Sequence, residues 1–86
     1  MSLIYCNINL FAVDQVIYAH DGTTEKEIAK TTLEHLNKVL PTLCYEKNIY
    51  NIHLYGLESF VQDIANGIMV YENLKYSDNK IKVEVN

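Results

Sequence analysis

The residues of this 86-residue sequence that could perform catalysis or bind metal ions form no recognisable motif, and their spacing favours structural roles. The three histidines, His20, His35 and His53, lie far apart, and none has the i, i+4 or Cys-x-x-Cys spacing typical of metal sites. Cys6 and Cys44 lie in apolar periodic segments, which predicts buried free thiols in a reducing cytosol rather than a disulfide or a nucleophile. We therefore expect no catalytic residue, no metal ion and no cofactor.

Two further motifs that could carry chemistry also favour structural roles. Ser59 lacks a Gly-x-Ser-x-Gly elbow, so the sequence does not predict a hydrolase triad. Gly56 precedes a predicted helix, as in anion-binding turns, but Glu58 follows it closely and would repel a phosphate. We therefore predict that Gly56 is a turn and cap glycine.

Tyrosine, histidine and asparagine side chains recur at alternate positions of the predicted strands and form the most informative pattern. A surface rich in these residues and poor in charge is typical of the core of a protein interface. Parallel strands normally have both faces covered, so we expect a protein partner here, most simply a second copy of the chain in a two-fold dimer. The alternative is a solvated sheet face. The predicted interface residues are Tyr5, Asn7, Asn9, Asn51, His53 and Tyr55, joined by Tyr18 and His20, whose strand has an ambiguous facing.

Alternation and helical periodicity predict the elements that position these residues. Strands are expected at 3–11, 15–20, 25–30, 49–55 and 81–85, and helices at 32–47 and 57–73. Residues 25–30 also fit the first turns of a helix, but Thr31 and Glu34 form a capping box that favours a later start. Asp21-Gly22 predicts a tight hairpin with a positive φ at the glycine. Pro41 is expected to kink the first helix or split it.

The second predicted helix has one apolar stripe. Its members are Leu57, Phe60, Val61, Ile64, Ala65, Ile68 and Met69.

The order of elements, βββαβαβ, predicts a single α/β domain over residues 1–86. A three-stranded meander followed by two right-handed crossovers gives a mixed five-stranded sheet in the order 3-2-1-4-5. Both crossovers run in the same direction, so both helices are expected on one face of the sheet. The result is a two-layer sandwich whose other face is uncovered.

This element order resembles a minimal ribonuclease-H-like and actin-like fold, similar to the small RuvC- and YqgF-type cores. The resemblance implies nuclease carboxylates on the first strand and near the end of the fourth, yet residues 3–11 and 53–56 contain no Asp or Glu. It also implies an Asp-x-Gly phosphate loop in the actin-like ATPases, but residues 12–16 contain Asp14 and no glycine. Residues 8–15 and 51–56 are also similar to small proteins of unknown function from Gram-positive bacteria and their phages.

Charge and hydropathy exclude several classes of partner. Seven lysines and no arginine face eleven acidic residues, a net charge of -4, which argues against nucleic acid and anionic membrane surfaces. The longest apolar run, residues 10–13, is far too short to span a bilayer, so we expect a cytoplasmic protein that is not exported. We therefore expect a non-enzymatic interaction module. The alternatives are a degenerate nuclease-like or nucleotide-binding domain and an acidic inhibitor of a nucleic-acid enzyme.

Overall fold

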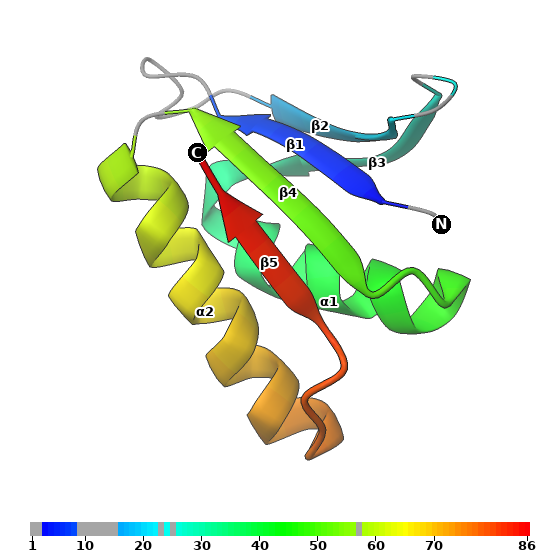
Figure 1. Ribbon diagram of the computed structural model, residues 1–86, viewed down its shortest axis with the longest axis vertical. Coiled ribbons are helices and arrows are strands. Elements are labelled where there is room, and N and C mark those ends of the chain that lie inside the picture. Colours follow the sequence, from blue (N-terminus) through cyan, green and yellow to red (C-terminus); the bar gives the residue numbers. More distant parts are fainter. Residues whose placement is uncertain (1–2, 9–15, 23, 25, 57) are drawn as a thin grey trace.

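The computed structural model describes residues 3–8, 16–22, 24, 26–56 and 58–86. Five strands form one mixed sheet in the order β3-β2-β1-β4-β5 (Figure 1). This confirms the predicted α/β class and strand order. The elements along the chain are β1 (Ile4–Ile8), β2 (Val16–Asp21), β3 (Glu27–Thr32), a 3₁₀ turn (Leu33–His35), α1 (Leu36–Lys47), β4 (Asn51–Gly56), α2 (Glu58–Tyr76) and β5 (Lys82–Val85).

The two helices form a single layer against the sheet. β1, β4 and β5 are parallel neighbours, whereas β2 runs antiparallel to both β1 and β3. The helices contact each other; α1 also contacts β3, and α2 contacts β4 and β5. This arrangement leaves the opposite face of the sheet without a covering element among the described residues (Figure 1).

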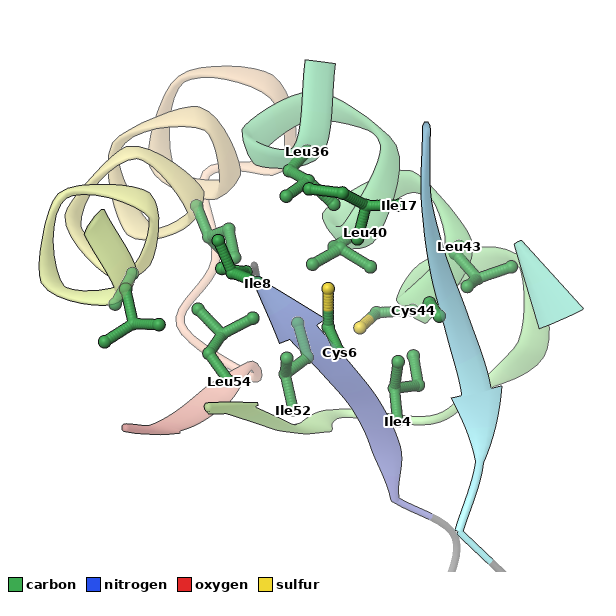
Figure 2. Close-up of a cluster of buried hydrophobic side chains, with 14 of the residues drawn as sticks. Ile4, Cys6, Ile8, Ile17, Leu36, Leu40, Leu43, Cys44, Ile52 and Leu54 are labelled. Atoms are coloured by element: carbon green, nitrogen blue, oxygen red, sulfur yellow. The ribbon is translucent and has the colours of Figure 1, made fainter. Parts of the chain in front are cut away.

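The hydrophobic core lies between these two layers. Alternate side chains of the strands point toward the helices and are fully buried, and leucines of α1 meet them from the other side (Figure 2). Burying this many large aliphatic side chains supplies the main driving force for folding. The strand residues of this core include Ile4, Cys6, Ile8, Ile17, Ala19, Ile52 and Leu54, and the α1 residues include Leu36, Leu40, Leu43 and Cys44.

Several predicted boundaries are wrong by a few residues. The third strand is confirmed as a strand but runs two residues later than predicted, from Glu27 to Thr32. The fourth extends to Gly56, where the sequence predicted an end at residue 55. Residues 9–11 and 15, which the sequence assigned to the first two strands, lie outside the described residues.

The predicted capping box does not form. Thr32, not Thr31, precedes the first helical turn, and its side chain makes no capping bond to the backbone. The Thr32 hydroxyl instead lies 2.8 Å from Nδ1 of His35. Because β3 continues through Thr32, the threonine backbone is extended, and the helix begins with a tighter 3₁₀ turn.

Pro41 lies inside α1 without dividing it. The helix is continuous from Leu36 to Lys47, so the expected split is wrong. Pro41 is buried in the core, and this packing offsets the loss of one backbone hydrogen bond. α1 ends at Asn48, whose left-handed conformation (φ 55°) closes the helix.

The apolar stripe of α2 differs from the predicted one at its edges. Val61, Ala65 and Ile68 are buried as expected, whereas Phe60 and Met69 are 38% and 51% exposed. The buried stripe instead continues from Ile68 to Glu72, one helical turn further on. Hydropathy alone favours a methionine over a glutamate on a buried face, so the sequence prediction was wrong here.

Candidate functional site

The predicted interface residues lie together on the side of the sheet opposite the helices, which we call the open face. In the strand register, Cys6 lies beside Ala19 and Leu54, and all three are buried against the helices. The alternate residues therefore point the other way. The open face contains Tyr5, Asn7, Tyr18, His20, Asn51, His53 and Tyr55. Asn9 lies outside the described residues.

The facing of β2, which the sequence left ambiguous, is settled by this register. Ile17 and Ala19 are buried, whereas Tyr18 is 47% exposed. Tyr18 and His20 therefore belong to the open face.

Tyr5 occupies the centre of an aromatic cluster on this face. It lies on β1 between His20 of β2 and His53 of β4, with ring centroids 5.7 and 5.6 Å away. The ring of Tyr55 meets Tyr5 edge to face at 6.4 Å and His53 at 5.7 Å. Such ring pairs each contribute about 0.5–1.5 kcal/mol beyond their buried area. Three neighbouring strands thus present one continuous aromatic surface.

Gly22 provides the space that Tyr5 occupies. A Cβ atom at Gly22 would overlap the Tyr5 ring. The predicted positive φ at this glycine is wrong, since Gly22 does not lie in the left-handed region. The turn is also longer than two residues, because the Asp21 amide donates to the Lys26 carbonyl at 3.0 Å. Glycine is therefore needed at position 22 because the Tyr5 ring packs against its backbone, and not because of the turn geometry.

Gly56 also serves a close approach. It is the last residue of β4 and pairs with Ile8 of β1, and a Cβ there would overlap the Ile8 carbonyl oxygen. Its φ of 150° is rarely adopted by other residues. Gly56 is thus a strand residue, not simply the predicted turn and cap glycine.

The two histidines of the cluster each contain a buried nitrogen atom without a hydrogen-bond partner. These atoms are Nδ1 of His20 and Nε2 of His53. A buried polar atom that lacks a partner costs about 1–3 kcal/mol. The centre of the open face therefore keeps hydrogen-bonding capacity that the described part of the chain does not use.

Charged side chains lie around this aromatic centre. At one side, the Lys30 ammonium lies 5.7 Å from the centroid of the Tyr18 ring. A shallow hollow of about 360 Å³ is lined there by Tyr18, His20, Glu27 and Tyr55. At the other side, the exposed Lys82 and Glu84 of β5 lie beside Asn51 and His53 in the strand register. An aromatic centre with a charged rim is the usual anatomy of a protein interface.

A second polar centre, which the sequence did not predict, lies on the helix side of the sheet. Glu72 is 2% exposed, and one oxygen of its carboxyl group, Oε2, accepts three hydrogen bonds. The donors are the Tyr45 hydroxyl at 2.6 Å and the amides of Lys80 and Ile81, both at 3.0 Å. This carboxyl group joins α1, α2 and the start of β5. The burial of Glu72 could have been predicted from its helical spacing, which places it on the same face of α2 as Ala65 and Ile68.

A tyrosine cluster surrounds this carboxyl group. The rings of Tyr45 and Tyr76 stack at 3.9 Å, and Tyr50 meets Tyr45 edge to face at 5.3 Å. The Lys80 ammonium lies 5.9 and 5.4 Å from the ring centroids of Tyr45 and Tyr50. Burial, together with the hydrogen bond to Glu72, raises the pKa of the Tyr45 phenol. The cluster thus joins α1, α2 and the start of β5, and Lys80 already covers the tyrosine rings that a ligand would contact.

The described residues contain no group of three or more His, Cys, Asp and Glu side chains that could hold a metal ion. His35 lies on the 3₁₀ turn, away from the two histidines of the open face.

Cys6 and Cys44 are buried free thiols, as predicted. Burial raises the pKa of each to about 12, so both are protonated at neutral pH. In the part of the chain that the structure covers, no helix is long and apolar enough to cross a membrane.

Comparison with known proteins gave no match: no family model matches the sequence, and the searches of curated proteins and of solved structures found no significant similarity. The resemblance to ribonuclease-H-like proteins therefore stays a prediction from topology.

Proposed function

We propose that this chain is a non-enzymatic interaction module that binds protein through the open face of its sheet, with a second copy of the chain as the simplest partner. The observation that carries the proposal is the aromatic cluster centred on Tyr5. Tyrosine is enriched among the residues that dominate binding energy, because a large rigid ring is buried at a low entropic cost.

The composition and layout of the face support this function. Sheets with parallel strands usually have both faces covered by other elements. Here β1, β4 and β5 are parallel, and one face is uncovered among the described residues. The unpartnered nitrogens of His20 and His53 add polar groups that a small rearrangement at an interface would pair. The composition and the uncovered state of this face thus favour contact with a protein over exposure to solvent.

Self-association of the wild-type chain and of a Tyr55→Asp variant tests this proposal. Sedimentation velocity over low to high micromolar concentrations should show that the wild-type chain self-associates. Tyr55→Asp places a charge within the aromatic cluster and should weaken open-face association by about 30-fold or more, the loss typical of a hot-spot residue. Tyr18→Asp, at the more exposed edge of the face, should have a smaller effect.

Leu74→Asp is the matched control, because Leu74 is 81% exposed on α2 and lies on the helix side of the molecule. It introduces the same charge at an exposed apolar position and should leave the dimer unchanged. Circular dichroism confirms that each variant is folded. A monomeric wild-type chain, or a Tyr55→Asp variant that associates as tightly as wild type, would overturn the proposal.

A further inference from the structure

The sheet has two edges, and they differ in their ability to accept another strand. β3 contains a bulge: its register with β2 shifts between Ala19 and His20, so that Ile28 has no counterpart. Bulges twist an edge and hinder pairing with another strand. β5 has a regular register with β4 from Lys82 to Val85 and contains no proline. Among the described residues, no strand lies on its outer side.

The backbone groups of β5 that face outward can be assigned from its bonds to β4. The amides of Lys82 and Asn86 donate to carbonyls of Tyr50 and Leu54. Alternate residues of a parallel strand bond to the same neighbour, so the amide and carbonyl groups of Val83 and Val85 point away from β4. These groups form an unpaired hydrogen-bonding edge.

We propose that β5 pairs antiparallel with β5 of a second copy of the chain, around a two-fold axis at Val83. In this register the two Val83 residues exchange two hydrogen bonds. The Val85 amide of each copy then donates to the Ile81 carbonyl of the other copy. The Ile81 amide takes no part, because it already donates to Glu72 at 3.0 Å. The pairing joins two five-stranded sheets into one continuous sheet.

The charges of β5 select this register. Pairing around Val83 places Lys82 of each copy opposite Glu84 of the other, at the non-hydrogen-bonded positions where side chains approach most closely. A two-fold axis at Lys82 would place two lysines opposite each other, and an axis at Glu84 would oppose two glutamates. Both alternatives bring like charges together and are disfavoured. Shifts by one residue would mismatch the hydrogen bonds and the two faces of the sheet.

The outer side of α2 fits the same symmetry. Gly67 faces α1, since a Cβ atom there would lie 3.0 Å from the Cβ of Asn37. Met69 lies on the opposite side of the helix, about 160° around its axis. It belongs to an exposed row without charge, formed by Gln62, Asn66, Met69 and Asn73.

The two α2 helices would become neighbours in this pairing. α2 contacts both β4 and β5 and lies along the β5 side of the molecule (Figure 1). The uncharged row would then face its own copy without charge repulsion.

This inference rests on a different surface from the proposed function. Edge pairing leaves the open face uncovered and doubles its width, so the two modes of association are compatible. The two proposals fail separately, because Tyr55→Asp alters only the open face, whereas the amides of Val83 and Val85 report only on the edge.

Charge exchange on β5, made in the Tyr55→Asp background so that open-face association does not contribute, tests the proposed register. Because of the two-fold axis, Lys82→Glu alone or Glu84→Lys alone creates two like-charged pairs and should weaken self-association by about 10- to 100-fold. The double exchange Lys82→Glu/Glu84→Lys restores both pairs and should dimerise like the Tyr55→Asp chain. A mixture of the two single variants should form a heterodimer. Lys38→Glu, an exposed exchange on α1 that changes net charge equally, is the control and should not weaken the dimer in this way.

Amide hydrogen exchange gives a second measurement that does not depend on side-chain charge. Protection of the Val83 and Val85 amides should rise with protein concentration, in wild type and in Tyr55→Asp alike. Exchange at these two amides that does not change with concentration would overturn the edge pairing. Equal loss of association in the single and double variants, without recovery in the mixture, would overturn the register.

Discussion

Replacing the buried Glu72 by glutamine should destabilise the domain strongly, although the two side chains have nearly the same shape. Glu72 Oε2 accepts from the Tyr45 hydroxyl and from the amides of Lys80 and Ile81. Three donors directed at one oxygen suit a charged acceptor, which accepts only and binds about twice as strongly as a neutral one. Glutamine keeps the acceptor oxygen and removes the charge.

The magnitude follows from these three hydrogen bonds. A hydrogen bond to a charged group contributes about 1.5–3 kcal/mol and a neutral one about 0.5–1.5 kcal/mol, so each bond loses about 1 kcal/mol. The lower cost of burying a neutral side chain offsets part of this loss. We expect the free energy of unfolding to fall by about 2 kcal/mol. Since domains of this length are stable by about 4–13 kcal/mol, Glu72→Gln should remain folded.

Urea denaturation followed by circular dichroism measures this loss. Glu46→Gln, at an exposed position on α1, is the matched control and should change stability by less than about 0.5 kcal/mol. Tyr45→Phe removes one of the three donors and should cost about 1–2 kcal/mol. The combined variant should lose less than the sum, because both changes remove the same bond. If Glu72→Gln were as stable as Glu46→Gln, the three bonds would not be a stabilising centre.

Three further changes test the packing of the sheet and the core. Gly22→Ala should displace the Tyr5 ring and cost about 1–2 kcal/mol in urea denaturation, and the cost should shrink in a Tyr5→Ala background. Gly56→Ala should cost more than Gly22→Ala, because its Cβ would meet a backbone carbonyl that cannot turn aside and its φ of 150° is strained; equal losses would contradict this. The pKa of Cys6 and Cys44 is raised from 9.0 to about 12 by burial, so the folded state favours the thiols, and stability should fall as pH rises above about 9. Replacing either cysteine by alanine should reduce that pH dependence, and an unchanged slope would refute the assignment.

The layers and strand order could be predicted from the sequence because the first and fourth strands show a clear period of two and each helix a stripe. Ile4, Cys6 and Ile8 alternate with polar residues, so their facing was determined before any tertiary contact was known. The order of elements and the handedness of crossovers then fixed the topology. The same alternation placed Tyr5 and Tyr55 on the open face.

The remaining features depend on contacts between residues far apart in the sequence. The role of Glu72 could not be predicted, because its three donors come from α1 and from the segment before β5. Gly22 looked like a turn glycine, because only the folded sheet brings Tyr5 over it. Secondary-structure propensity depends on residues close in the sequence and cannot predict such contacts. Boundaries were also wrong where tertiary structure outweighed local signals, as at the capping box around Thr31.

Glu72 also links the stability of the domain to the proposed edge pairing. Its carboxyl group holds the amides of Lys80 and Ile81 at the point where the chain enters β5. These two bonds fix the start of the strand, and with it which residues of β5 face outward. Glu72→Gln should therefore increase hydrogen exchange in the monomer at the Lys82 amide, which donates to the Tyr50 carbonyl, and weaken self-association. Tyr45→Phe, which leaves both amide bonds intact, should affect stability more than association. If the two variants reduced association equally for equal losses of stability, the carboxyl group would act on the fold as a whole and not on the position of β5.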